Sequence, residues 1–215
     1  MRFFFLIAAL LAGITVGYSQ ELREDPELDR KVEQFLRERA GKWWDMNVPV
    51  TDAEKLYDLI IDGNYTRALE IGTSTGHSGI YMAWALSKTG GKLITIEINE
   101  ERYREAVRNF EEAGLSKYVD ARLADAHTLV KELPGPFDFV FSDADKGWYK
   151  NYFLDVDPKL EVGGCYTTHN VIDGRGTGRR GNNQSYLDFV RSQENYESTL
   201  YTRGNGLLIS YKRAE

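Results

Sequence analysis

The chain has 215 residues, 42% of them hydrophobic and 28% charged, which suits one globular domain with a core and is short for two. Its formal net charge is −6, which argues against binding nucleic acid through neutralised phosphates. The single cysteine, Cys165, excludes an internal disulfide and leaves no cysteine pair for a zinc or redox site. We therefore expect a small-molecule or protein partner and no nucleic acid.

Residues 1–19 have the pattern of an export signal. A basic start at Arg2 precedes an apolar run from Phe3 to Val16, and small residues follow up to Ser19. The run is shorter than the roughly 20 residues that span a bilayer. We expect a cleaved signal peptide and a periplasmic or secreted protein. The alternatives are an uncleaved N-terminal anchor, which would be the protein's only membrane attachment, and a buried N-terminal helix.

Residues 20–62 are predicted to form two N-terminal helices. The first extends from Asp25 to Ala40, where apolar side chains recur at helical spacing. The second extends from Asp52 to Asp62. Thr51 precedes this helix and Glu54 lies three positions later, which is the spacing of a capping box.

Residues 63–215 alternate between strands and helices and form the predicted main domain. The expected strands are 68–71, 93–97, 118–123, 137–142 and 165–168, and the expected helices are 78–87, 100–113, 126–133, 147–156 and 186–192. Two closing strands, around 198–201 and 206–211, are close enough to form an antiparallel hairpin. Such alternation with short links predicts an α/β fold with a mostly parallel sheet and helices on both faces.

A glycine-rich turn follows the first strand, in the segment ALEIGTSTGHSG. Glu70 is followed by Gly72, Gly76 and Gly79 at the entry to a helix. Glycines let the backbone approach a ligand closely, and a helix N-terminus offers free N–H groups. The glycine spacing departs from the G-x-G-x-x-G pattern of dinucleotide sites. We therefore expect a ligand without a pyrophosphate, whose cationic amino-acid moiety is attracted by Glu70.

Two further acids follow the next two strands. Glu97 ends the second strand, where an acid in Rossmann-like folds accepts hydrogen bonds from ribose hydroxyls. Asp125 follows the third strand, where it could meet an adenine amino group or simply cap the next helix. Ligands bind at the carboxyl ends of strands in open α/β sheets, so these acids predict a single crevice.

Polar residues also follow the strands FDFVFS and CYTT. Asp143 and Lys146 come after the first of these strands, and His169 and Asn170 after the second. If the strands are neighbours, Asp143, His169 and Asn170 converge beside the cofactor. Oxygen ligands suit a hard divalent cation, which would polarise an acceptor hydroxyl. Lys146 could then take the proton, provided that the nearby cations favour its neutral form.

From about Met46 onward the chain resembles the metal-dependent O-methyltransferases of the catechol and caffeoyl-CoA type. The resemblance is carried by the segments MNVPVTDAEKLYDLI, LEIGTSTGHSG, ITIEINEERYREAVRNFEEAGL, FDFVFSDADKGWYKNYF, GGCYTTHNV and NGLLI. It implies the seven-stranded, Rossmann-like class I methyltransferase fold and S-adenosylmethionine as methyl donor. It also implies a small acceptor with a catechol-like or phenolic hydroxyl, and a homodimer as a possible assembly.

The resemblance also implies roles for individual residues. By position, the cofactor site comprises Val48, Glu70, Gly72, Ser78, Glu97, Asp125, Ala126 and Asp143. Asp143 matches a residue shared between metal and cofactor, Asn170 matches a second metal ligand, and Lys146 matches the base.

One position departs from the family pattern. The family usually has an aspartate immediately before the asparagine, and this chain has His169. The expected metal set is then Asp143, His169 and Asn170. Imidazole prefers softer metals than Mg²⁺, and one interpretation is that the site holds Mn²⁺, Fe²⁺ or Zn²⁺. Alternatively, it binds metal poorly and His169 serves as a catalytic base, or it is catalytically impaired.

The sequence also leaves alternatives open for the function, for one loop and for four aromatic residues. The alternatives to methyl transfer are a nicotinamide-dependent oxidoreductase and an exported, non-catalytic binding protein. The Gly- and Arg-rich segment 174–183 is either a surface connection or a flap over the site. Four aromatic residues could wall an aromatic acceptor or simply pack in the core: Trp43, Trp44, Trp148 and Tyr149.

Overall fold

The computed structural model describes residues 21–43, 46–174 and 183–215. The predicted leader at 1–19, Trp44 and most of the segment 174–183 lie outside these residues. Within the described ranges, no helix combines the length and the apolar character needed to cross a bilayer.

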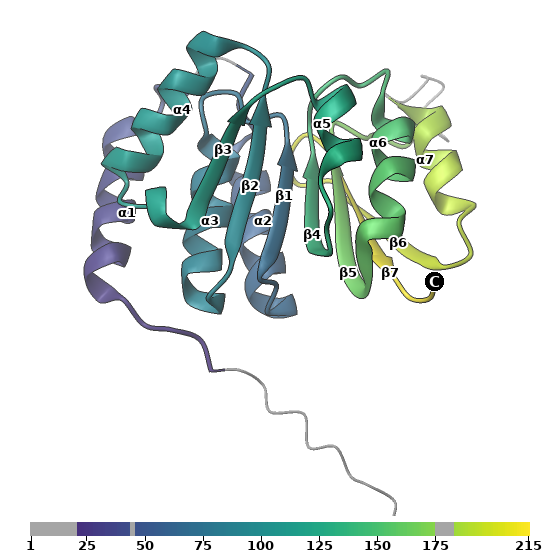
Figure 1. Cartoon of the computed structure of the whole chain (residues 1–215), viewed down its shortest axis with the longest axis horizontal. Coiled ribbons are helices and arrows are strands. Elements are labelled where there is room, and N and C mark those ends of the chain that lie inside the picture. Colours follow the sequence, from purple (N-terminus) through teal and green to yellow (C-terminus); the bar gives the residue numbers. More distant parts are fainter. Residues whose placement is uncertain (1–20, 44–45, 175–182) are drawn as a thin grey trace, which may run out of the picture.

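The described residues form the predicted alternation of helices and strands (Figure 1). The α-helices are α1 (Pro26–Arg39), α2 (Val50–Gly63), α3 (His77–Thr89), α4 (Glu100–Glu112), α5 (Ala126–Glu132), α6 (Tyr149–Val156) and α7 (Gln184–Arg191). The strands are β1 (Arg67–Ile71), β2 (Lys92–Glu97), β3 (Val119–Leu123), β4 (Phe137–Ser142), β5 (Leu160–His169), β6 (Tyr196–Tyr201) and β7 (Leu207–Lys212).

The strands join into one seven-stranded sheet in the order β3-β2-β1-β4-β5-β7-β6. Strands β1 to β5 pair in parallel, whereas β7 lies antiparallel between β5 and β6. The order turns back between β1 and β4, which is where ligands bind in open α/β sheets. This confirms the predicted fold class and the predicted terminal hairpin.

Helices cover both faces of the sheet. On one face, α2 and α3 pack against the strands through residues such as Leu56 and Met82, and α1 and α4 pack against α3. On the other face lie α5, α6 and α7, with Val130, Phe153 and Leu187 in the core (Figure 1). Because both faces are buried, the middle of β4 is apolar throughout, as the sequence FDFVFS predicted.

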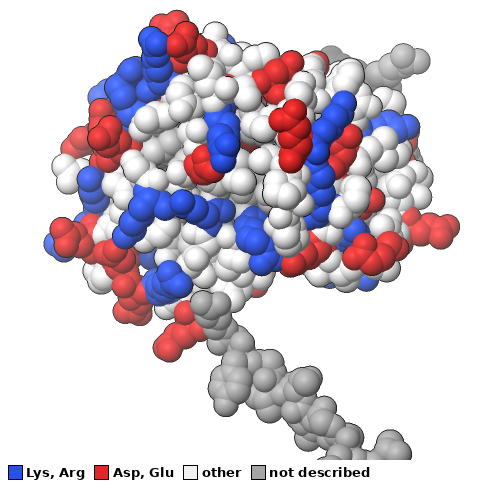
Figure 2. Space-filling view, viewed as in Figure 1, with Lys and Arg blue, Asp and Glu red and all other residues white. Residues whose placement is uncertain are grey.

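Charges of both signs are interspersed over the face of the molecule in Figure 2. The described residues include exposed ion pairs such as Arg104 with Glu100 at 2.5 Å and Arg213 with Glu197 at 2.6 Å. Exposed pairs of this kind contribute little to the free energy of unfolding.

Two predicted boundaries were wrong, and both affect the site. Helix α2 begins at Val50 with Pro49 as its N-cap, so Thr51 lies inside the helix and does not cap it. Asp52 consequently lies in the first turn and is fully buried. Strand β5 begins at Leu160 and ends with His169, which is therefore held rigidly by the sheet.

Candidate active site

A cavity of about 290 Å³ opens at the carboxyl ends of β1, β2, β3 and β4. Its volume is near the lower end of the range for small-molecule sites, about 300–1,000 Å³. Five of the residues predicted for the cofactor line it: Gly72, Glu97, Asp125, Ala126 and Asp143. The other three predicted cofactor residues lie outside its lining: Val48, Glu70 and Ser78.

Gly72 brings the first strand end close to the fourth. Its φ is +102°, and its amide donates to the Ile96 carbonyl at 3.0 Å. A Cβ added here would lie 2.7 Å from the Asp143 carbonyl oxygen, which is too close for any side chain. The glycine is therefore required both by its left-handed backbone and by this close approach.

Glu70 is buried beneath the glycine-rich turn. Its carboxylate accepts hydrogen bonds from Ser78 Oγ at 2.5 Å and Thr95 Oγ1 at 2.6 Å, which joins β1 to α3 and β2. Burial raises the pKa of Glu70 to about 8, although the two hydrogen bonds partly oppose the shift. Glu70 therefore stabilises the glycine-rich turn by linking β1 to α3 and β2, and it does not line the cavity.

Glu97 combines a supporting role with a place in the cavity wall. Its Oε2 accepts from the Ser74 amide at 2.7 Å, and its Oε1 accepts from the Asn99 amide at 2.9 Å. The side chain is 6% exposed. A carboxylate has about four lone-pair positions, so Glu97 can accept further hydrogen bonds from a bound hydroxyl pair.

The rim of the cavity carries Asp125, His127 and Asp145. Asp125 caps α5 by accepting from the His127 amide at 2.9 Å, so the capping role weighed from the sequence is present. The His127 ring lies 3.5 Å from the Asp125 carboxylate and 3.4 Å from that of Asp145. Lys146 follows on the same loop and is exposed.

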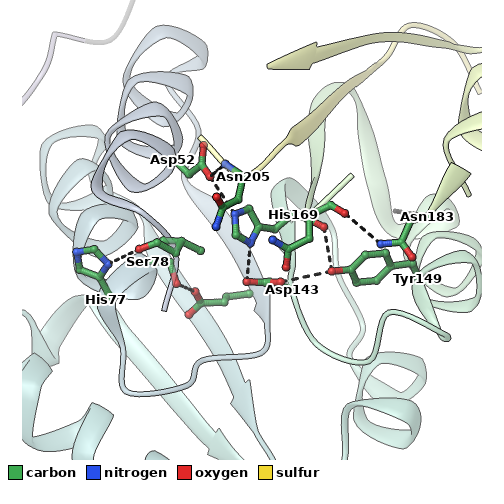
Figure 3. Close-up of polar contacts among 11 residues, drawn as sticks. Asp52, His77, Ser78, Asp143, Tyr149, His169, Asn183 and Asn205 are labelled. Carbon is green, nitrogen blue, oxygen red and sulfur yellow. Dashed lines mark hydrogen bonds and ion pairs between the residues drawn. The ribbon is translucent and has the colours of Figure 1, made fainter. Parts of the chain in front are cut away.

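The neighbouring strands β4 and β5 bring Asp143 and His169 together, as predicted (Figure 3). Asp143 Oδ2 lies 2.9 Å from His169 Nδ1. The hydroxyl of Tyr149 donates to the His169 carbonyl at 3.0 Å and lies 3.4 Å from Asp143 Oδ1. Asn170 has a positive φ of +56°, and its carbonyl accepts from Asn183 Nδ2 at 3.2 Å.

The structure adds a residue that sequence reasoning missed. Asp52 approaches the far side of the His169 ring, with its Oδ2 2.9 Å from Nε2 (Figure 3). The same oxygen accepts from the Asn205 amide at 2.8 Å, so α2 meets the loop between β6 and β7 here. A Cβ on Gly204 would lie 2.0 Å from Asp52 Oδ1, so this position leaves no room for a side chain.

His169 thus lies between two carboxylates and is almost fully buried. Burial alone would lower the pKa of His169, but the hydrogen bonds and charges of Asp143 and Asp52 outweigh it and raise the pKa to about 9. At neutral pH both ring nitrogens carry a proton and donate to a carboxylate. This arrangement gives His169 no lone pair with which to accept a proton.

The same arrangement does not fit the predicted metal set of Asp143, His169 and Asn170. A histidine binds a metal through the lone pair of a neutral ring nitrogen, and both nitrogens here are engaged. Across the residues described, no group of three or more His, Cys, Asp or Glu side chains is arranged to hold a metal ion.

The predicted aromatic wall is not assembled as a unit. Trp43 stacks on His77 at 4.6 Å, whereas Trp148 lies against His127 at 4.5 Å, beside the cavity rim. Tyr149 is buried, 1% exposed, and holds the end of β5 through its hydroxyl. Of the three aromatic residues that the structure describes, Trp148 packs against the cavity-lining His127, and Tyr149 approaches the cavity-lining Asp143 through its hydroxyl.

Comparison with known proteins agrees with this geometry. Residues 20–191 match the model of the O-methyltransferase family. The chain is 45% identical to a catechol O-methyltransferase of Niastella koreensis over 112 residues, half of either chain. It is 30% identical to a flavonoid 3',5'-methyltransferase of Vitis vinifera over 83% of this chain and 80% of that relative.

Solved structures show the same fold. The O-methyltransferase TomG of Streptomyces achromogenes, solved in complex with S-adenosylmethionine, is 25% identical and has a TM-score of 0.71. The match covers 90% of this chain and 92% of that one. An O-methyltransferase of Bacillus cereus, solved with SAH, also has a TM-score of 0.71, at 24% identity and with coverage of 89% and 92%.

Proposed function

Since the chain belongs to the O-methyltransferase family, we propose that it moves a methyl group from S-adenosylmethionine to a hydroxyl of a small phenolic or catechol-like acceptor. The observation that carries this proposal is the cavity at the carboxyl ends of β1 to β4. Gly72, Glu97 and Asp143 all line this cavity. The nicotinamide and binding-protein alternatives find no support in the comparisons.

The cavity offers complementary groups for each part of the donor. Glu97 is placed to accept hydrogen bonds from the two ribose hydroxyls. The side chain of Asp125 lies at the rim, where an adenine amino group would reach it. Gly72 leaves room for the amino-acid part, and Asp143 lines the same cavity, where its negative charge would attract the positively charged sulfur.

The transfer needs no covalent intermediate between the substrate and the protein. The acceptor hydroxyl gives its proton to a base, and its oxygen forms a bond to the methyl carbon. The bond between that carbon and sulfur breaks, and the electron pair remains on sulfur. The products are a methyl ether and S-adenosylhomocysteine. The site contributes in-line positioning of the two reactants and exclusion of water.

Lys146 is the base in this proposal, and it can take the proton only as its neutral amine, since an ammonium group has no lone pair. Lys146 is exposed and follows Asp143 by three positions on the loop that begins at the cavity, so an acceptor bound at the rim would lie beside this loop. His169 is a poor base at neutral pH because both of its nitrogens already donate to carboxylates. Its role is instead to fix Asp143.

A binding and transfer experiment tests the proposal. Titration calorimetry with S-adenosylmethionine and S-adenosylhomocysteine should show one site per chain. Incubation with methyl-labelled donor and a panel of catechols and phenols should give a labelled ether. Asp143→Ala should abolish transfer while the protein stays folded. Absence of binding to either nucleoside would overturn the proposed function.

A further inference from the structure

We infer that the side chain of His169, clamped between Asp52 and Asp143, fills the place where a divalent cation would join these carboxylates, and that this chain transfers methyl groups without a bound metal. The inference rests on the proposed function. It concerns how the acceptor side of the site is built.

The first support is the position of the ring between its partners. Nδ1 lies 2.9 Å from Asp143 and Nε2 lies 2.9 Å from Asp52, so the two carboxylates approach opposite sides of the imidazole. Figure 3 shows the three side chains in a row. Carboxylates only accept hydrogen bonds, so a ring that bonds to both must donate from both nitrogens. It then joins the two acids as a cation, with the short contacts of charge-assisted hydrogen bonds.

The second support is burial. The side chains of His169 and Asp52 are 3% and 0% exposed, and that of Asp143 is 13% exposed. Two buried carboxylates facing one space repel each other unless a positive charge lies between them. The imidazole ring supplies that charge, and it leaves neither nitrogen for coordination.

The third support is how firmly Asp52 is held. Its Oδ2 also accepts from the Asn205 amide, and Gly204 packs against its carboxyl group without a side chain. His169 itself is the last residue of β5 and pairs with Leu207 of β7. A metal could replace the ring between the two carboxylates only if these packed elements moved apart.

The inference is tested first on the wild-type protein with Mn²⁺ as the probe. Electron paramagnetic resonance of free Mn²⁺ counts bound ions directly, with and without S-adenosylhomocysteine. We expect no bound Mn²⁺ at millimolar concentration, and an unchanged kcat/KM after treatment with EDTA. One tightly bound Mn²⁺ per chain that is lost in Asp143→Asn would overturn the inference, as would loss of activity on chelation that is restored by Mg²⁺ or Mn²⁺.

Substitution of the histidine gives the reverse test. In His169→Asp a third carboxylate replaces the ring next to Asp52 and Asp143, and we expect this variant to gain one Mn²⁺ per chain. The asparagine of His169→Asn has the shape of the aspartate without its negative charge, so this variant should bind no Mn²⁺. Equal Mn²⁺ binding by wild type and H169D would contradict the inference.

A second measurement covers the case in which H169D fails to fold. In wild-type protein with ¹⁵N-labelled histidine, the His169 ring signals are assigned by their absence in His169→Gln. They should show two protonated nitrogens and should not broaden when paramagnetic Mn²⁺ is added. Selective broadening of these signals would overturn the inference.

These readouts separate the inference from the proposed function. If the protein binds no S-adenosylmethionine, the proposed function fails, and the Mn²⁺ count still decides whether the site takes a metal. If it binds S-adenosylmethionine and also one Mn²⁺ between Asp52 and Asp143, only the metal-free inference fails.

Discussion

Asp52 and His169 are separated by 117 positions in the chain, yet the Asp52 carboxylate lies 2.9 Å from the His169 ring. This contact joins the first turn of α2 to the end of β5. The positively charged His169 ring also contacts Asp143, and Asp143 lines the proposed cofactor cavity.

Removal of Asp52 should destabilise the protein strongly. Asp52→Ala leaves the buried His169 with one carboxylate instead of two and orphans the Asn205 amide. Breaking a buried ion pair in this way lowers the free energy of unfolding by about 3–5 kcal/mol. Urea denaturation at pH 7 measures the change. Asp58→Ala, an exposed position on the same helix, is the control and should change it by less than about 0.5 kcal/mol.

Gly72 and Gly163, which both have a left-handed φ, should respond differently to alanine. Gly163 has φ +90° and open space around it, so Gly163→Ala should cost about 1–2 kcal/mol of backbone strain. Gly72 has φ +102° and faces the Asp143 carbonyl, so Gly72→Ala adds about 1–3 kcal/mol of overpacking. It should also abolish S-adenosylmethionine binding. Equal free energies of unfolding for the two variants would contradict the prediction, because the contact of a Cβ at position 72 with the Asp143 carbonyl would then have no energetic effect.

Glu97 should determine the affinity for the donor. Hydrogen bonds to a charged group contribute about 1.5–3 kcal/mol each, so the loss of even one such bond in Glu97→Ala should raise the Kd for S-adenosylmethionine by at least about 10-fold. Titration calorimetry gives the value. Glu101→Ala, exposed on α4, is the matched control and should leave the Kd unchanged. A Kd for Glu97→Ala close to that of wild type would place the ribose elsewhere.

Glu70 should make stability depend on pH in the ligand-free protein. Its pKa is raised from 4.5 to about 8 in the folded state, mainly by burial. The contribution of Glu70 is therefore fully present below about pH 4.5 and is lost as the pH rises through about 8. Glu70→Gln does not titrate, so the stability of wild type relative to this variant should fall over that window. Denaturant titrations at several pH values test it; a constant difference would contradict the assigned shift.

Lys146 should affect transfer and not donor binding. Loss of a general base lowers kcat by about 10²- to 10⁴-fold, so we expect a decrease of that size in Lys146→Met. The Kd for S-adenosylmethionine should stay unchanged. Lys150→Met, an exposed position on α6 whose amine lies over the Phe189 ring, controls for the loss of a nearby positive charge. Similar kcat values for the two variants would remove Lys146 from the reaction.

Much of the site was predictable from sequence because it lies where parallel strands end. The glycine-rich turn after β1 and the acids after β2, β3 and β4 are each identified by their position next to an apolar strand. The carboxyl ends of these strands converge once the sheet forms, which is why Gly72, Glu97, Asp125 and Asp143 line one cavity. The proximity of Asp143 and His169 followed from the same reasoning, since β4 and β5 are neighbours.

The sequence by itself thus determined the order of elements, the parallel sheet and most of the cavity wall, because these depend on local patterns and on one rule of sheet geometry. Only the tertiary structure decided what His169 does. Asp52 comes from a helix that precedes the strand–helix alternation. In the sequence it cannot be told apart from the many acidic residues that stabilise the first turn of a helix through the helix dipole. Its burial against Gly204 and His169 depends on how α2 packs beside the β6–β7 loop, and no local pattern encodes that packing.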